Sequence, residues 1–286
     1  MIKNERIKIG LVQASASQNL DENLSKAEKS IDEASKKGAD IVCLQELFAT
    51  RYFAQAEKKD FFRLAEKIPG KITNFLSRCA KKSGVFLIGG SLFEKGEDNK
   101  YYNTSLAFGK EGQIIGKYRK VHIPNDPKYY EQYYFSPGNL GFVQIKMEEI
   151  VISPLICYDQ WYPEASRINA LKGASIIFYP TAIGWLKEMK GHEPWSAKRW
   201  QSAMCAQASM NGIFVAAANR VGKEEEMDFW GNSFIANPFG EIVAQASGKK
   251  EEVLVAEICL SKVKASQEGW GFLKNRQPKN YSELIK

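Results

Sequence analysis

Three ionisable residues occur where predicted elements end, and their types together suit nucleophilic catalysis. Glu46 closes a nearly continuous apolar run, Lys120 follows a predicted hairpin, and Cys157 follows a run rich in β-branched residues. A cysteine can supply a nucleophile, a glutamate can accept its proton and later activate water, and a lysine can stabilise a developing oxyanion. The three lie far apart in the chain, so their types alone do not establish that they meet.

The segment around Cys157 carries the clearest local signal. Residues 151–156 read VISPLI, which is typical of a buried strand, and Pro163 opens a helical pattern. We therefore expect Cys157 on a strand-to-helix turn, near a helix N-terminus that favours the thiolate. The polar and aromatic residues at 158–162 indicate the floor of a pocket. The alternative is a buried structural cysteine, because free cysteines are among the most buried residues.

The predicted elements follow the same order in both halves of the chain: strand, helix, strand, helix, then several strands. Strands packed against strands with helices outside would give an α/β fold, a four-layer α-β-β-α sandwich. The predicted strands are 7–14, 39–47, 85–93, 101–108, 113–118, 151–156, 174–179, 213–218, 231–237, 241–246 and 253–260. The predicted helices begin near Asp21, Pro69, Pro163 and Pro194, and they end before Gly38, Gly84, Gly173 and Gly212.

No Gly/Ser-rich or charged linker divides the chain, so we predict a single domain over residues 1–286. Within it, the basic tail 261–286 includes Trp270 and Phe272, and we expect this tail to make subunit contacts. Residues 121–141 are rich in proline and aromatic side chains, which is typical of a structured loop rather than a flexible linker.

The composition is that of an ordinary soluble globular protein, with 44% hydrophobic and 26% charged residues among 286. The net charge is +7, but lysine and arginine are interspersed with acidic residues, so we predict no nucleic-acid partner. No apolar run approaches the roughly 20 residues of a transmembrane helix, and the N-terminus lacks a signal-peptide pattern. We therefore predict no membrane association. Five unclustered cysteines and two distant histidines argue against disulfides and structural zinc, and they fit a reducing cytoplasm.

Several motifs extend this interpretation along nearly the whole chain. They are GLVQ (10–13), LQELFATRYF (44–53), KYRKVHIP (117–124), YYFSPGN (133–139), LICYDQWYPEASR (155–167), AANRVG (217–222) and GNSFIANPFGE (231–241). In this order they resemble the nitrilase, or carbon–nitrogen hydrolase, superfamily. The resemblance implies the α-β-β-α fold, a Glu-Lys-Cys triad and a homo-oligomer, dimeric or higher. It also implies cysteine-dependent hydrolysis of a non-peptide C–N bond, with no metal or other cofactor.

Carried over residue by residue, the resemblance assigns Glu46 as general base, Lys120 as oxyanion and proton donor, and Cys157 as nucleophile. A second glutamate of the superfamily falls on Glu131, where it would orient Lys120 or the substrate. The backbone N–H of Tyr158 would share the oxyanion. From the residues alone, Lys120 could be one more surface cation, and Glu131 could simply accept hydrogen bonds from neighbouring tyrosines.

Three stretches, 45–55, 122–138 and 156–165, resemble the branch that hydrolyses N-carbamoylputrescine to putrescine, carbon dioxide and ammonia, a step of polyamine biosynthesis. This resemblance predicts a small ureido or amide substrate. Asn125 departs from the branch, which usually has aspartate there. A carboxylate at that position could pair with the ammonium of putrescine, and Asp126 is adjacent.

Other candidates follow from their positions beside the predicted site. We expect Trp161, together with Tyr162, to wall the substrate channel, and Tyr158 to contact the substrate. Thr181 follows a strand at the same end of the sheet and would touch the substrate carbonyl. For a substrate ammonium, Glu188 and Asp228 are further candidates beside Asp126.

Alternative functions stay open at this point. The protein could be an amidase or a β-ureidopropionase-like hydrolase of another small amide or ureido compound. A substrate carboxylate would call for an arginine, and Arg51, Arg167 and Arg199 are available. From a different class, it could be a catalytically silent binding module with a structural Cys157. A thiol-selective alkylator would then show no preference for that cysteine.

Overall fold

Two β-sheets form the centre of the molecule in the computed structural model, which describes residues 6–285. The first sheet has the order β18-β1-β2-β3-β5-β4, with β6 paired to β5. Its strands are β1 (Arg6–Gln13), β2 (Ile41–Cys43), β3 (Phe86–Ile88), β4 (Leu92–Lys95), β5 (Tyr101–Phe108), β6 (Ile114–Arg119) and β18 (Glu252–Cys259). The second sheet has the order β17-β16-β13-β11-β10-β9. Its strands are β9 (Ile145–Met147), β10 (Ile150–Pro154), β11 (Ile176–Thr181), β13 (Phe214–Asn219), β16 (Phe234–Ala236) and β17 (Ile242–Gln245).

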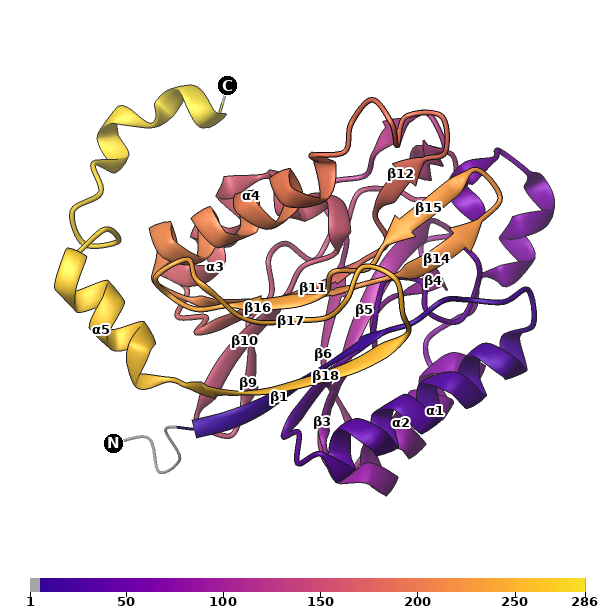
Figure 1. Cartoon of the computed structure of the whole chain (residues 1–286), viewed down its shortest axis with the longest axis horizontal. Coiled ribbons are helices and arrows are strands. Elements are labelled where there is room, and N and C mark those ends of the chain that lie inside the picture. Colours follow the sequence, from indigo (N-terminus) through magenta and orange to yellow (C-terminus); the bar gives the residue numbers. More distant parts are fainter. Residues whose placement is uncertain (1–5, 286) are drawn as a thin grey trace.

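Helices cover the outer faces of both sheets (Figure 1). The helices α1 (Leu20–Lys36) and α2 (Lys71–Ser83) pack on the first sheet. The helices α3 (Pro163–Leu171) and α4 (Ser196–Asn211) pack on the second. The predicted α-β-β-α sandwich is therefore confirmed.

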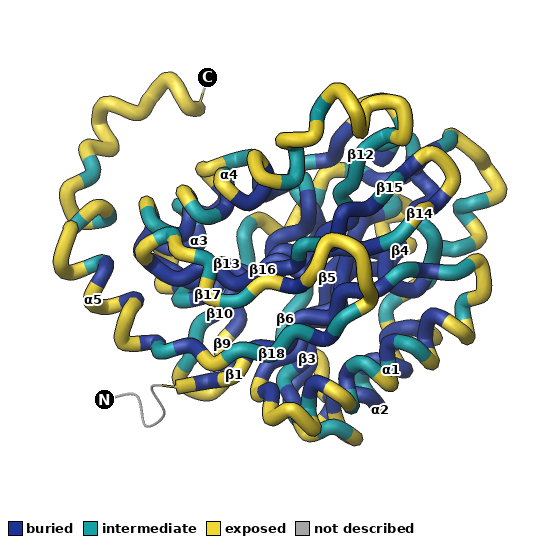
Figure 2. The backbone as a smooth tube through the Cα atoms, in the orientation of Figure 1, coloured by how far each residue is buried: buried dark blue, intermediate teal, exposed yellow. Residues whose placement is uncertain are grey.

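Alternate residues of a strand enter different layers of the core. In β1, Leu11 belongs to the apolar cluster between the sheets, whereas Val12 packs against the outer helices. In β11, Ile176 and Ile177 divide in the same way. Because both faces of the strands are covered, their sequences are continuous apolar runs, and Figure 2 shows the sheets as mostly buried.

Two boundaries differ from the prediction for physical reasons. Asn19, not Asp21, caps α1, because its side-chain oxygen accepts hydrogen bonds from two backbone N–H groups of the first turn. The predicted strand 85–93 divides into β3 and β4 at Gly90, which has a φ of +61°. A Cβ there would lie 2.1 Å from the carbonyl oxygen of Gln45, so only glycine fits.

Several short elements were not predicted from the sequence. A three-stranded sheet of β12, β14 and β15 lies at one end of the sandwich (Figure 1). Its strands are β12 (Gly184–Leu186), β14 (Val221–Glu224) and β15 (Met227–Trp230). A separate pair consists of β7 (Asn125–Asp126) and β8 (Tyr129–Tyr130), and the last α-helix is α5 (Ser261–Trp270). Short 3₁₀ helices occupy Phe53–Gln55, Lys59–Leu64, Glu131–Tyr133, Cys157–Trp161, Pro278–Asn280 and Ser282–Ile285.

The C-terminal tail leaves the sandwich after β18. Its helix α5 buries Val263 and Ser266, and the residues that follow run along the outside of the molecule, mostly exposed (Figures 1 and 2). Within residues 6–285, no helix combines the length and the apolar character needed to cross a membrane.

Candidate active site

Cys157 sits where the chain leaves β10 and enters a short 3₁₀ helix. Its backbone has a φ of +39°, which is unusual for a residue with a side chain, so the turn needs support. The buried carboxylate of Asp159 supplies it by accepting hydrogen bonds from the N–H of Ile156 at 2.9 Å, the hydroxyl of Tyr118 at 2.8 Å and the N–H of His122 at 3.1 Å. These contacts fix the direction of the Cys157 thiol.

Glu46 and Lys120 meet directly in the interior, as the sequence hypothesis required. The predicted strand 39–47 ends early, so Glu46 lies on a turn after β2, whereas Lys120 follows β6. The Lys120 Nζ donates to Glu46 Oε1 at 2.9 Å and to Glu131 Oε2 at 2.6 Å. Asn103 Nδ2 on β5 also donates to Glu46 Oε1, at 2.8 Å. Neighbouring strands of one sheet thus bring distant residues together.

The second oxygen of Glu46 has an unused hydrogen-bonding capacity. Glu46 Oε2 is buried, and no described residue donates a hydrogen bond to it. Its carboxylate is otherwise held by Lys120 and Asn103 through Oε1 alone. An unpaired buried acceptor of this kind is unfavourable, and it is free to take a proton.

The thiol of Cys157 is neutral at rest, contrary to the expectation of a favoured thiolate. Burial raises the pKa of Cys157 well above its usual value, and the charge of Glu46 raises it further. The charge of Lys120 and the backbone N–H of Ala182 act in the opposite direction but do not outweigh burial. The neighbouring helix end is therefore insufficient to ionise this thiol, and a base is required.

Lys120 keeps its charge although it is fully buried. Burial alone would lower the pKa of Lys120, but the charges of Glu131 and Glu46 outweigh it and raise the pKa above its usual value. Burial raises the pKa of Glu131, and the nearby charge of Glu46 acts in the same direction. Glu131 Oε1 also accepts the hydroxyl proton of Tyr52 at 2.7 Å. With both oxygens occupied, Glu131 is placed to orient Lys120.

A cavity of about 640 Å³ opens onto Cys157. Aromatic side chains form much of its wall, and acidic groups outnumber basic ones in it. Its lining consists of Pro124, Asp126, Pro127, Tyr129, Cys157, Tyr158, Trp161, Ile183, Gly184, Trp185, Leu186, Glu188, Met189, Glu193, Ser196, Arg199 and Trp230. An apolar cleft with a few polar groups and one nucleophile is the usual form of a small-molecule site.

A comparison with known families decides the kind of protein. The sequence profile of the carbon–nitrogen hydrolases matches residues 8–268. The chain belongs to this family. The carbon–nitrogen hydrolase is 40% identical to an N-carbamoylputrescine amidase of Solanum lycopersicum, over 99% of this chain and 96% of that protein. It is 36% identical to a citrullinase of Francisella tularensis, over 98% of both chains. A crystal structure of a carbon–nitrogen hydrolase from Helicobacter pylori G27 is 39% identical and superposes with a TM-score of 0.94, covering 98% of this chain and 99% of the other.

The predicted substrate-binding residues of this hydrolase fall into two groups. Tyr158, Trp161 and Asp126 line the cavity. Asn125 is exposed beside it and is not part of the lining. Thr181 is fully buried, and its hydroxyl donates to the carbonyl oxygen of Tyr179 at 2.9 Å, so it also lies outside the lining.

The further charged candidates divide in the same way. Glu188 and Arg199 line the cavity. Asp228 is not part of the lining and pairs with Lys190 at 2.5 Å. Arg51 and Arg167 are not in the lining either. The positions of Glu188 and Asp228 depend on residues 182–193 and 221–230, whose path the sequence patterns did not predict.

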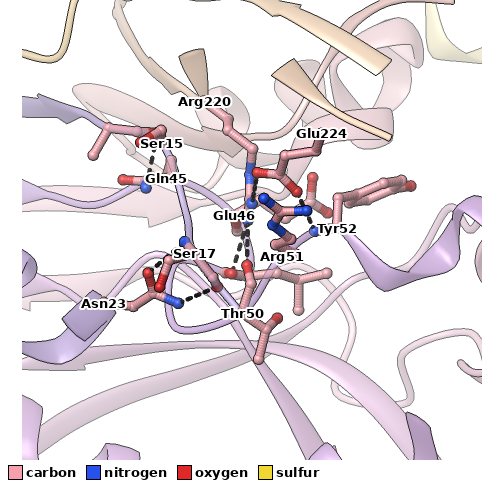
Figure 3. Close-up of polar contacts among 12 residues, drawn as sticks. Ser15, Ser17, Asn23, Gln45, Glu46, Thr50, Arg51, Tyr52, Arg220 and Glu224 are labelled. Atoms are coloured by element: carbon pink, nitrogen blue, oxygen red, sulfur yellow. Dashed lines mark hydrogen bonds and ion pairs between the residues drawn. The ribbon is translucent and has the colours of Figure 1, made fainter. Parts of the chain in front are cut away.

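Some residues around the hydrolase site were missed from the sequence. Asn103 contacts Glu46, and its amide side chain within the strand YYNTSLAF was a usable signal of a buried polar contact. Tyr52 is buried against Glu131 and Tyr129 lines the cavity, but nothing in their sequence context separates them from other tyrosines of the chain. Arg220 contacts the turn that carries Glu46 (Figure 3), and its place after a buried strand was a signal of a paired internal charge.

No group of three histidine, cysteine, aspartate or glutamate side chains able to hold a metal ion occurs among residues 6–285 of the hydrolase. Glu46 and Glu131 instead pair with the Lys120 ammonium.

Proposed function

We propose that this enzyme hydrolyses N-carbamoylputrescine to putrescine, carbon dioxide and ammonia, as a cytoplasmic step of polyamine biosynthesis, with Glu46, Lys120 and Cys157 as its catalytic residues. The observation that carries the proposal is the buried Glu46 carboxylate beside a thiol that needs a base. One of its oxygens is tied to Lys120, and the other has no donor among the described residues. The relatives named above support the choice of substrate.

The proposed reaction begins with a proton transfer. Glu46 Oε2 accepts the proton of Cys157 Sγ, and the sulfur forms a bond to the carbamoyl carbon while the C=O electron pair moves to oxygen. Lys120 has three N–H donors, and its carboxylate partners use two of them, so the third can stabilise this oxyanion with the Tyr158 N–H. Collapse of the intermediate breaks the C–N bond, and Glu46 returns the proton to the leaving nitrogen.

Water completes the proposed cycle. Glu46 takes a proton from a water molecule, whose oxygen attacks the carbonyl carbon of the acyl-cysteine intermediate. The sulfur leaves and takes that proton back from Glu46, and the carbamic acid that is released breaks down to carbon dioxide and the second nitrogen product. Glu131 does not touch the substrate in this scheme. It acts as a positioning residue, because one of its oxygens holds Lys120 and the other holds Tyr52.

The charge of the cavity favours a cationic substrate. Asp126, Glu188 and Glu193 line it together with a single arginine, Arg199, among the described residues of the lining. The Arg199 guanidinium also lies 5.8 Å from the ring centroid of Trp161, which places it against an aromatic wall. A chain of methylene groups ending in an ammonium fits aromatic walls and surplus carboxylates better than an anionic ureido acid does.

A second candidate is an amino-acid or ureido-acid substrate, such as citrulline or N-carbamoyl-β-alanine. Arg199 is the specific observation in its favour, because a guanidinium in the lining could pair with a substrate carboxylate.

Ammonia release separates these candidates. We expect kcat/KM for N-carbamoylputrescine to exceed those for citrulline, N-carbamoyl-β-alanine and a simple ω-amide by at least about tenfold, the equivalent of about 1.4 kcal/mol of transition-state binding. Glu188→Gln should raise KM for the cationic substrate and leave kcat nearly unchanged. A higher kcat/KM for citrulline, which is zwitterionic, or for N-carbamoyl-β-alanine, which is anionic, would refute the putrescine assignment.

We also propose a homo-oligomer in which the tail contributes to the subunit contact. Trp270, Phe272, Leu284 and Ile285 are 69%, 46%, 66% and 88% exposed in the single chain. Large apolar side chains gathered on one segment mark an interaction surface more often than a solvent-facing one. Light scattering of the purified enzyme tests this proposal, and a monomeric mass at micromolar concentration would refute it.

A further inference from the structure

We propose that Arg220, paired with Glu224, is a positioning residue that holds the general base Glu46 in its catalytic orientation. The inference rests on the proposed function, because it assigns Glu46 that role. Arg220 follows β13 and is fully buried, as is nearly all of Glu224 at the end of β14. Neither residue lines the cavity, so neither touches a substrate there.

The guanidinium of Arg220 contacts the turn of Glu46 at several carbonyl groups. Its Nη2 atom lies 3.1 Å from the carbonyl oxygen of Glu46, 2.8 Å from that of Leu47 and 3.0 Å from that of Thr50. Figure 3 shows the side chain directed at this turn, with Glu224 beside it. One planar cation thus supplies a donor to the carbonyl groups of Glu46 and Thr50 and a second donor to that of Leu47, which also accepts the Thr50 N–H at 3.1 Å.

The turn needs such support because its backbone is strained. Leu47 has a φ of +47°, in the left-handed region that side chains other than glycine rarely adopt. A second contact, from the Leu47 N–H to Ser91 Oγ at 3.0 Å, holds the opposite side of the peptide chain. If the carbonyl contacts were lost, the turn could relax, and the Glu46 carboxylate would turn away from Cys157.

Glu224, the acidic member of the ion pair, is connected through Tyr52 to Glu131, which holds Lys120. Arg220 Nη1 donates to Glu224 Oε1 at 2.6 Å, and Glu224 Oε2 accepts the backbone N–H of Tyr52 at 2.7 Å. The hydroxyl of Tyr52 then donates to Glu131 at 2.7 Å. The pair therefore anchors both ends of the segment from Glu46 to Tyr52, and through it both carboxylates that hold Lys120.

A purely structural role is the competing explanation, since any buried arginine and glutamate neutralise each other. The two roles differ in what substitution removes. In Arg220→Lys, the charge beside Glu224 is kept, but the planar fork that bridges the carbonyls is lost. In the double variant Arg220→Met with Glu224→Gln, the charges leave together. The amide oxygen of the new side chain can still accept the Tyr52 N–H, so only the donors to the turn are missing.

The test measures hydrolysis and the rate at which 2-chloroacetamide alkylates Cys157, in folded enzyme checked by circular dichroism. For both variants we expect kcat and the alkylation rate to fall together by at least about tenfold, with KM changed less than about twofold. The exposed pair of Arg51 with Glu225, at 2.6 Å on the same segment, gives the matched control Arg51→Lys, which should behave as wild type.

Wild-type kcat and alkylation rate in either folded variant would overturn the inference, as would a rise in KM with kcat unchanged. Recovery of activity in the double variant alone would show that charge neutralisation is the whole role of the pair, which also overturns it. If the wild-type enzyme itself hydrolysed no ureido or amide compound and showed no preferential labelling of Cys157, the proposed function would fail instead.

Discussion

At the scale of single residues, the central feature is that the two oxygens of the Glu46 carboxylate have different surroundings. Glu46 Oε1 is held by Lys120 and Asn103, and Oε2 accepts no hydrogen bond from the described part of the chain. In the proposed mechanism, this free acceptor is the base for the neutral, buried thiol of Cys157, which the helix end alone does not ionise. The charge of Lys120 survives burial only because Glu131 and Glu46 flank it.

The variant Glu46→Gln tests whether the second oxygen of Glu46 acts as the base. The amide oxygen can still accept from Lys120 and Asn103, so we expect the fold to persist, but the base is gone. We expect kcat to fall by about 10²- to 10⁴-fold, with KM nearly unchanged. Steady-state ammonia release measures both constants, and the exposed Glu149→Gln serves as the control. A loss of less than about tenfold would argue for a different base.

The residues of the proposed catalytic centre could be named from the sequence, although its geometry could not. Glu46, Lys120 and Cys157 follow apolar strands or a hairpin, and the ends of neighbouring strands meet. The neutral state of Cys157 was missed because the burial that raises its pKa depends on how distant parts of the chain pack around it, which the local sequence does not show. Asn125 and Thr181 lie outside the cavity lining for a similar reason, since loop paths decide which side chains face it.

At the scale of elements, the apolar runs predicted most strands and helices. The sheet of β12, β14 and β15 was missed because its strands are short and the turn at 224–226 consists of glutamates. Such a hairpin is stabilised by cross-strand packing rather than by an apolar run of its own. The two strands of the 85–93 run were merged because the separation depends on the close approach of Gly90 to Gln45.

The cap of α1 offers a prediction confined to one element. Asn19 accepts hydrogen bonds from the backbone N–H groups of Asp21 and Glu22 at 2.9 and 3.3 Å. Asn19→Ala should lower the free energy of unfolding by about 1 kcal/mol. Denaturant unfolding measures the change, and kcat should stay at the wild-type value, because the cap lies outside the catalytic centre. An unchanged stability would show that this cap contributes nothing.

Glu94 on β4 should make the stability of the protein depend on pH in the acid range. Burial would raise the pKa of Glu94, but hydrogen bonds from Arg119, Lys117 and Thr104 outweigh it and lower the pKa below the usual value. The unfolded chain therefore binds a proton at a higher pH than the folded chain does. The contribution of Glu94 is present at neutral pH and is lost as the pH falls below about 4 through the folded-state pKa.

The free energy of unfolding of Glu94→Gln and of the wild type, measured as a function of pH, tests the direction of this dependence. We expect the variant to be less stable by about 2 kcal/mol at neutral pH and the difference to shrink in acid. A difference that grew as the pH fell would contradict the lowered pKa of Glu94.

At the scale of the whole molecule, two sheets bring residues from both halves of the chain to one buried site. Glu46 and Lys120 come from the first sheet, whereas Cys157 follows β10 of the second. The apolar cluster between the sheets therefore fixes the distance between base and nucleophile. Interiors packed this closely tolerate little sliding, which suits a reaction that needs atoms aligned to within an ångström.

The exposed tail allows a prediction about assembly. Trp270 and Phe272 stack on each other with ring centroids 5.8 Å apart, and both are exposed in the single chain. Replacing both by serine should shift the enzyme to a smaller oligomer in light scattering, because their apolar area would no longer be buried in a subunit contact. The exposed Ile114→Ser on β6 is the control. An unchanged mass would place the contact elsewhere.

The most direct test of the catalytic centre is ammonia release by Cys157→Ala, with the best substrate of the ureido and amide panel. The substitution removes one sulfur atom at the end of the cavity, so the protein should fold as the wild type does. We expect no hydrolysis above the uncatalysed rate. Sustained turnover by the folded variant would contradict the assignment of Cys157 as nucleophile, and with it the convergence of thiol, carboxylate and ammonium on one carbon.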